Sequence, residues 1–236
     1  MDKGLRYLPP ATPCHYLPEQ MWRLEYRIVN QLSQQEFHDL VARGWRRFGN
    51  MLFRPRCPSC IACQPIRVIA DAFKPDRSQR RVTKLNADTR LEIGQPTLDD
   101  ERLDLYFRHH AHHADQKGWP DPDIDRGVRH IHSIVAGPLP VMEWAYYRDD
   151  KLVAVSYVDD LGDGFSGIYF YHDPEYRKYS LGTWICLSLI EEAAQRHLPY
   201  VYLGYYIAGC RSMEYKGQFG PNQVLQPDGQ WVNFRG

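Results

Sequence analysis

Residues 141–173 read VMEWAYYRDDKLVAVSYVDDLGDGFSGIYFYHD, and this stretch does most to decide the fold class. Its runs of Val, Ile, Tyr and Phe are interrupted at residues 148–151 (RDDK) and 161–164 (LGDG), both of which are typical turn sequences. Long β-prone runs separated by short polar turns predict three strands joined as an antiparallel meander.

The residues that follow add a helix and a further strand. SLGTWICLSLIEEAAQRHL at 180–198 has the length and composition of a helix that begins at Ser180, and LPYVYLGYY at 198–206 reads as a buried strand. Three strands, a helix and a strand in this order predict an α+β fold. Upstream, Ser33 and Glu36 have the spacing of a capping box for a helix that ends near Gly44.

The charges are distributed unevenly along a chain of zero net charge. Residues 1–90 contain 16 Lys and Arg against 8 Asp and Glu, whereas residues 91–236 contain 13 against 21. A basic half suits a polyanion such as RNA, because neutralising phosphates dominates that affinity. A solvated basic face is the alternative.

Composition narrows both the cellular compartment expected for the protein and the roles expected for its cysteines. Hydrophobic residues make up 43% of the 236 residues and charged residues 25%, which is ordinary for a globular protein. The sequence has no apolar run near the ~20 residues of a spanning helix, and its first residues lack the apolar centre of a signal peptide. We therefore expect a cytoplasmic protein without a membrane partner, whose six cysteines serve metal binding, catalysis or burial rather than disulfides.

Three of the cysteines lie in one short stretch, RPRCPSCIACQPIRV at 54–68, between two expected strands at 51–55 and 65–73. Cys57, Cys60 and Cys63 would supply three thiols, and Cys14 is the natural fourth. Their CxxCxxC spacing resembles that of iron–sulfur proteins, while zinc more often uses paired CxxC loops. Both groups therefore remain open, with Cys186 expected in the core.

Two further motifs are ambiguous. His109 and His113 stand at i,i+4 within HHAHH on a helix expected over 98–118, but the glutamate of a zincin motif is missing, so a polar helix face is the better interpretation. Ser180, Leu181 and Gly182 open the helix at 180–198, where backbone N–H groups could bind an anion or an acyl carbonyl. A plain cap at Ser180 is the equal alternative.

Taken in order, several blocks resemble the arginyl-tRNA–protein transferase family, most closely its shorter bacterial branch, the aspartate/glutamate leucyltransferases. The blocks span nearly the whole chain: CHYL from Cys14, GWRRFG at 44–49, RPRCPSCIACQPIRV, FKPDRSQRRVTKLN at 73–86, YRKYSLG at 176–182 and VYLGYYIAGCRSMEYKGQFGP at 201–221. Eukaryotic members open with C-x-x-C, and the second of those positions is Leu17 here.

The resemblance implies a transferase that moves leucine from leucyl-tRNA to the N-terminus of proteins beginning with Asp or Glu, which marks them for degradation. It implies a basic domain over residues 1–90, with an iron–sulfur cluster or zinc on Cys14, Cys57, Cys60 and Cys63. This domain would pack on an acetyltransferase-like (GNAT-type) domain over residues 91–236 that uses no coenzyme A.

Roles follow from the chemistry of that reaction. Forming an amide from an ester needs positioning more than activation, and the nucleophile is the substrate's own α-amine. We expect arginines to bind the acidic side chain of the acceptor, basic residues to bind tRNA phosphates, aromatic and apolar residues to surround leucine, and two polar residues to orient the amine or the ester oxygen. The candidates are, in that order, Arg46, Arg47 and Arg67; Arg77, Arg80, Arg81 and Lys84; Tyr169, Tyr171, Leu203, Tyr205 and Tyr206; and again Tyr205, with Lys216.

Two other functions remain open on the sequence. An arginyl transferase of the same family would need an acidic residue facing the transferred side chain. A non-enzymatic metal-containing RNA-binding module would explain the basic half and the cysteines, but it would leave the second half without a role.

Overall fold

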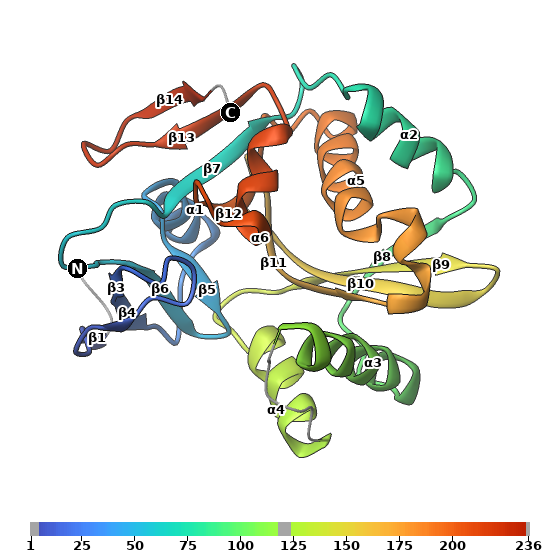
Figure 1. The fold of residues 1–236 in the computed structure, drawn as a ribbon, viewed down its shortest axis with the longest axis horizontal. Helices are drawn as coiled ribbons and strands as arrows, with labels where there is room; N and C mark the ends of the chain where they lie inside the picture. The colour runs from blue at the N-terminus through green and yellow to red at the C-terminus, as the bar shows by residue number, and fades with distance from the viewer. Residues whose placement is uncertain (1–4, 118–123, 235–236) are drawn as a thin grey trace.

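The computed structural model describes residues 5–117 and 124–234, which form a mixed α/β fold (Figure 1). Its larger sheet has eight strands in the order β14-β13-β7-β12-β11-β10-β9-β8. The strands of this sheet are β7 (Gln64–Ile69), β8 (Arg90–Gly94), β9 (Met142–Arg148), β10 (Lys151–Asp160), β11 (Gly164–His172), β12 (Tyr200–Tyr206), β13 (Asn222–Leu225) and β14 (Trp231–Phe234).

A second sheet of four strands comes from the N-terminal part of the chain, in the order β1-β4-β6-β5. Its strands are all antiparallel to their neighbours, and a short pair, β2 and β3, lies beside them. The bounds are β1 (Leu5–Tyr7), β2 (Thr12–Pro13), β3 (Met21–Trp22), β4 (Leu24–Ile28), β5 (Arg46–Phe48) and β6 (Met51–Pro55).

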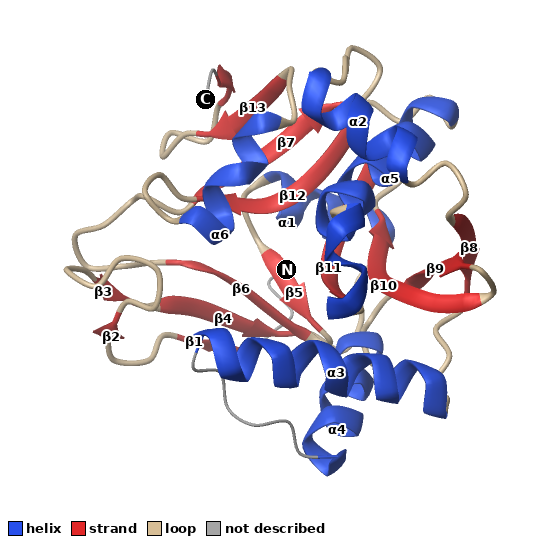
Figure 2. Cartoon of the chain, turned by 45° about the vertical axis from the view of Figure 1, so that its right-hand side comes forward, coloured by secondary structure: helices blue, strands red, loops and turns tan. Residues whose placement is uncertain are grey.

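Helices cover both faces of the larger sheet, as Figure 2 shows. The α5 helix packs against β11 and β12 with α2 beside it, while α3 packs against β10 and β11 on the other face with α4 beside it. The bounds are α1 (Gln34–Ala42), α2 (Arg77–Leu85), α3 (Asp100–Lys117), α4 (Ile124–Val135), α5 (Leu181–Gln195) and α6 (Arg211–Glu214), with 3-10 turns η1 (Pro174–Tyr179) and η2 (Tyr215–Gln218).

The decisive stretch folds as its sequence predicts. β9, β10 and β11 form the antiparallel meander, and α5 then leads to β12. The capping box before α1 is also confirmed: the Ser33 hydroxyl accepts from the backbone N–H of Glu36, and the Glu36 carboxylate accepts from the backbone N–H of Ser33. Local sequence and long-range packing therefore agree at these positions.

The strands β11 and β12 diverge, and this divergence positions the site. They pair in parallel only over Gly164–Ser166 and Tyr200–Tyr202. Beyond that short ladder β11 continues along β10 to His172, whereas β12 continues along β7 to Tyr206. The sheet consequently opens between the two strands above the start of α5.

The N-terminal and C-terminal parts of the chain share the larger sheet. β7 lies between β12 and β13 and is antiparallel to both, with Val68 opposite Val201 and Asn222. The division into domains 1–90 and 91–236 stays a prediction, but the hydrogen bonds of β7 cross that boundary. In residues 5–117 and 124–234, no helix combines the length and apolar character needed to cross a bilayer.

Candidate active site

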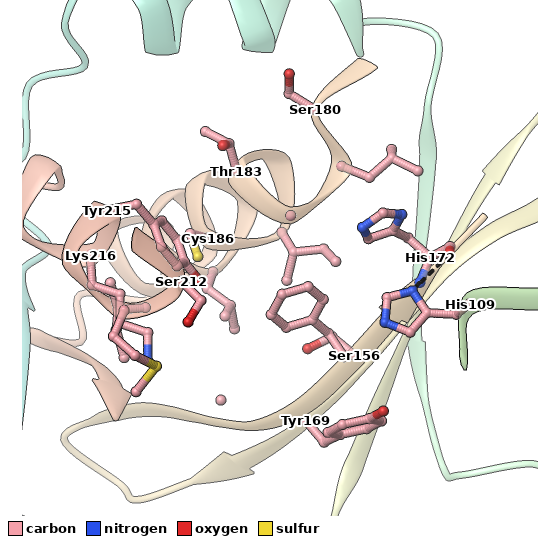
Figure 3. A pocket seen from close by; sticks show the side chains of 18 of the residues that line it. His109, Ser156, Tyr169, His172, Ser180, Thr183, Cys186, Ser212, Tyr215 and Lys216 are labelled. Carbon is pink, nitrogen blue, oxygen red and sulfur yellow. Dashed lines mark hydrogen bonds between the residues drawn. The ribbon is translucent and has the colours of Figure 1, made fainter. Parts of the chain in front are cut away.

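A cavity of about 550 Å³ occupies the opening between β11 and β12 (Figure 3). β11 supplies Gly167–Phe170 and His172, α5 and the turn before it supply Arg177 and Ser180–Thr183, and the segment after β12 supplies Ser212, Met213, Tyr215 and Lys216. The floor is apolar, with Ile168, Ile185, Leu189 and Leu203. Among the described residues that line this cavity none is Asp or Glu, whereas Arg177 and Lys216 are basic.

His109 enters this cavity from α3, and its predicted place on a polar helix face is wrong. The α3 helix packs this face against β11, so the imidazole is buried and its Nδ1 lies 3.0 Å from the carbonyl oxygen of His172. Burial, with His172 and His113 close by, lowers the pKa of His109 to about 3. His109 is therefore neutral at physiological pH, and the periodicity of HHAHH could not show which side of the helix the sheet would cover.

A second cavity, of about 230 Å³, adjoins the first on the side of the N-terminal sheet. The two share five lining residues: Gly167, Ile168, Leu203, Met213 and Lys216. The remaining wall of the smaller cavity includes Tyr16, Arg46, Phe53 and Tyr205. Lys216 is the only basic residue among those that both cavities share.

Arg46 is buried in the wall of the smaller cavity. Its guanidinium donates to the backbone carbonyls of Val41, Trp45 and Gly204, at 3.3, 2.8 and 3.2 Å. Its Nε is buried and has no hydrogen-bond partner, and no carboxylate in the described part of the chain forms an ion pair with Arg46. Burial lowers the pKa of this side chain, so the site would gain from an anionic ligand.

A distortion in β12 brings Arg46 and Lys216 to the same place. The pairing of β12 with β7 shifts register between Tyr202 and Tyr205, and Gly204 there has a φ of +85°. That left-handed conformation favours glycine, and it leaves the Gly204 carbonyl available to Arg46. A Cβ on Gly204 would lie 3.5 Å from the Nζ of Lys216.

Lys216 lies where the two cavities meet. Its Nζ donates to the carbonyl of Tyr205 at 3.1 Å and lies 3.6 Å from the sulfur of Met213. Burial lowers the pKa of Lys216 to about 8. Close to neutral pH this amine can therefore either hold or release a proton.

The other two arginines proposed for substrate binding have partners of their own. The Arg47 guanidinium donates to both carboxylate oxygens of Asp159, and both side chains are buried. The Arg67 guanidinium lies over the rings of Tyr200 and Trp231, at 3.7 and 4.3 Å, and lines neither cavity. Arg46 is thus the one of the three with binding capacity left.

The tyrosines divide in a similar way. Tyr169 lines the larger cavity, and Tyr205 lines the smaller one while its hydroxyl donates to the Gly44 carbonyl at 2.7 Å. Tyr171 is fully buried in the core beneath α3, and the ring of Tyr206 packs on Phe234. Neither Tyr171 nor Tyr206 lines either cavity.

Ser180 does not cap α5 through its side chain. It has a left-handed backbone, with φ of 54°, and its hydroxyl makes no capping hydrogen bond. Ser180, Leu181 and Gly182 all line the larger cavity, and an anion or carbonyl site at this helix start stays a prediction.

The basic residues assigned to tRNA lie together on α2. This helix begins with a capping box, in which Asp76 and Gln79 exchange hydrogen bonds with each other's backbone. Its single buried side chain is Gln79, so the basic residues are exposed on the outer surface; they are Arg77, Arg80, Arg81 and Lys84.

The four cysteines expected to bind a metal line one small cavity of about 60 Å³, together with Tyr16 and Tyr205. Burial and the nearby thiols of Cys57, Cys14 and Cys60 raise the pKa of Cys63 to about 12. Four converging thiols suit zinc or an iron–sulfur cluster chemically. However, among the described residues no three His, Cys, Asp or Glu side chains stand in a geometry that would hold a metal ion.

Some features of the site left little trace in the sequence. Tyr16 separates the cysteine cavity from the smaller cavity, and Cys186, expected in the core, is buried but also lines the larger cavity. In the sequence, the one hint of a role for Tyr16 in the site is its position two residues after Cys14. Together, the two adjoining cavities that share Lys216 form the candidate active site.

Comparison with known proteins places this site in a family. The chain matches the model "Arginine-tRNA-protein transferase, N terminus" over residues 12–81 and "Arginine-tRNA-protein transferase, C terminus" over residues 101–226. The chain therefore belongs to the arginine-tRNA-protein transferase family, as its sequence motifs indicated.

Its relatives include proteins named aspartate/glutamate leucyltransferase. That of Campylobacter jejuni (strain 81-176) is 36% identical over 90% of this chain and 89% of the relative, and that of Nitrosococcus oceani is 38% identical over 95% and 94%. Among solved structures, L-PGS from Bacillus licheniformis has a TM-score of 0.48 at 10% identity, covering 79% of this chain and 54% of L-PGS. FemX has a TM-score of 0.47 at 8% identity, covering 88% and 81%.

Proposed function

We propose that this enzyme transfers leucine from leucyl-tRNA to the α-amine of proteins that begin with Asp or Glu. The observation that carries the proposal is the placement of Lys216 between two cavities of different character. One cavity is apolar at its floor and has no acid among its described residues, and the other contains the buried Arg46, which ion-pairs with no carboxylate of the described residues.

The larger cavity favours leucine over arginine as the transferred residue. Its apolar floor suits a branched aliphatic side chain. An arginyl side chain would need a carboxylate to compensate its charge, but the described part of the cavity wall offers none and carries two basic residues of its own, Arg177 and Lys216. The acidic residue among those described in the smaller cavity, Asp159, is engaged by Arg47.

The smaller cavity suits the N-terminal residue of the acceptor. Arg46 lines this cavity without an ion-pair partner among the described residues, so a carboxylate of Asp or Glu can compensate its charge in a site where water is largely excluded. The α-amine of the same residue then lies toward Lys216, because Lys216 lines the boundary with the larger cavity.

The transfer proceeds by direct attack. The neutral α-amine attacks the ester carbonyl carbon, a C–N bond forms, and the bond from that carbon to the ribose oxygen breaks. Lys216, as the neutral amine, takes the proton that the attacking nitrogen loses, and it returns a proton to the departing ribose oxygen. The N–H groups at the start of α5 and the neutral His109 supply polar groups near the ester.

The tRNA would lie with its phosphates along α2. The support is that the basic residues of α2 are exposed and that α2 packs beside α5, the helix whose first turn lines the larger cavity. The divergence of β11 and β12 above α5 supports an acetyltransferase-like (GNAT-type) catalytic half, in which the aminoacyl end of tRNA takes the place of coenzyme A.

The cysteine cavity is proposed to hold zinc or an iron–sulfur cluster. Cys14, Cys57, Cys60 and Cys63 would hold it, and it would tie the N-terminal arm to the loop between β6 and β7. Because the donor would be leucyl-tRNA, we place the enzyme in the cytoplasm, where the product would enter N-degron degradation.

Transfer assays test the proposal directly. Purified protein is incubated with leucyl-tRNA or arginyl-tRNA and with peptides that begin with Asp, Glu or Lys. Leucine should appear on the Asp and Glu peptides only. Transfer of arginine would favour the arginyl transferase, and tRNA binding without any transfer would favour an RNA-binding module.

A further inference from the structure

One face of the N-terminal sheet is apolar and partly open, and it begins at Arg46. Directly opposed residues on neighbouring strands form a row of Arg46, Phe53, Tyr26 and Tyr7, from β5 through β6 and β4 to β1. Because side chains two residues apart share a face, a second row lies beside it: Phe48, Met51, Ile28 and Leu5. All of these residues except Arg46 are apolar or aromatic.

Exposure along this face increases with distance from the cavity. Arg46 is buried and Phe53 lines the smaller cavity, whereas Tyr7 is 57% exposed, Ile28 42% and Leu5 70%. The rings of Tyr26 and Tyr7 stack with centroids 6.5 Å apart. An apolar strip thus leads from the smaller cavity to the surface of the molecule.

We propose that this strip binds the acceptor polypeptide beyond its first residue; the proposal rests on the proposed function. A protein whose N-terminal carboxylate side chain lies at Arg46 must leave the cavity, and the strip begins there. Charge favours polypeptide over nucleic acid as the occupant. Apart from Arg46 the strip has no basic side chain for phosphates, whereas Arg6 and Arg54 lie on the other face and ion-pair with Glu25.

Geometry sets the length of the bound segment. Neighbouring strands lie about 4.8 Å apart, so three steps from Arg46 to Tyr7 span about 14 Å. An extended chain advances about 3.3 Å per residue, and about four residues after the first would therefore cover the strip. Acceptors with apolar residues at these positions should bind best.

The test measures leucyl transfer to three acceptors: Asp-Gly, a hexapeptide that begins with Asp followed by apolar residues, and one that begins with Asp followed by Gly and Ser. The wild-type enzyme should show a KM for the apolar hexapeptide about tenfold below that for the dipeptide, which corresponds to about 1.4 kcal/mol. In the Tyr7→Ser/Ile28→Ser variant most of that ratio should be lost. Ile61→Ser, which changes a 77% exposed residue of the cysteine loop, should keep it.

The outcomes separate the inference from the proposed function. Equal KM values for all acceptors on the wild-type enzyme would overturn the strip but leave leucyl transfer in place, and no transfer to any acceptor would overturn the function itself. A rise in the KM for leucyl-tRNA in the Tyr7→Ser/Ile28→Ser variant would assign the strip to tRNA instead. If the wild-type protein is a dimer in light scattering and the Tyr7→Ser/Ile28→Ser variant is a monomer, the strip would be assigned to a second copy of the chain.

Discussion

Replacing Arg46 by Gln should collapse the preference of the enzyme for Asp over Asn at the acceptor N-terminus. In the wild-type protein a carboxylate would meet the buried Arg46, which has no ion-pair partner among the described residues. Removing one member of such a buried, hydrogen-bonded charge pair costs about 2–5 kcal/mol. The kcat/KM for an Asp peptide should therefore fall by about 30-fold or more.

The Asn peptide provides the internal reference for this experiment. It has no charge for Arg46 to neutralise, so its kcat/KM should change less than about tenfold, and the Asp/Asn ratio isolates the electrostatic contribution. Arg46 also donates to three backbone carbonyls, and each one left without a donor costs about 1–3 kcal/mol of stability. A thermal melt must accordingly show that the variant is folded at the assay temperature.

A second arginine of the N-terminal sheet makes a matched control. Arg54→Gln removes the same charge, but Arg54 ion-pairs with Glu25 at 2.7 Å and lines neither cavity. Its Asp/Asn ratio should therefore stay at the wild-type value. If Arg46→Gln keeps the ratio, or if Arg54→Gln loses it, the assignment of the acceptor carboxylate to Arg46 is wrong.

Three further outcomes follow from contacts described above. Below pH 7.5 a plot of the logarithm of the transfer rate against pH should have a slope near 2 for the wild-type enzyme, because both the α-amine and Lys216 (pKa about 8) must lose a proton. The slope should be near 1 for Lys216→Gln. Equal slopes for the two enzymes would exclude Lys216 as the base. Cys63→Ser should reduce the iron or zinc content of the purified protein at least severalfold, and metal-free wild-type protein from an anaerobic preparation would contradict a bound metal. Asn86→Ala removes two buried hydrogen bonds to backbone carbonyls and should lower the free energy of unfolding by about 1–3 kcal/mol, against less than about 0.5 kcal/mol for the exposed Thr83→Ala.

The sequence predicted those parts of the fold in which local pattern and tertiary packing agree. The meander of β9 to β11, the long α5 and the capping box at Ser33 are examples, since each depends on residues close together in the chain. The hairpin of β13 and β14 was missed, although PDG at 227–229 is a turn sequence. Its strands are only four residues long, and β7 is what completes their pairing.

The candidate site was harder to predict because side-chain partners come from distant segments. Arg46 and Arg47 are adjacent and chemically identical in the sequence, and both line the smaller cavity, yet Arg47 is engaged by the buried Asp159 whereas Arg46 donates to backbone carbonyls. Tyr169 and Tyr171 share a strand face in the same pattern, but only Tyr169 reaches the cavity. The residue types in the sequence indicated the chemistry of the site, whereas packing determined which of two residues of the same type is available in the cavity.

The position of β7 has a consequence for how the protein is made. A ribosome releases Gln64–Ile69 long before it releases β12 and β13, the two strands that β7 joins. Until then both edges of β7 carry unpaired backbone groups, which is a hazard for association with other chains. A fragment that begins at residue 91 would have the opposite defect, with β12 and β13 each lacking the same neighbour. The interdependence of the two parts of the chain is therefore a matter of synthesis as well as of stability.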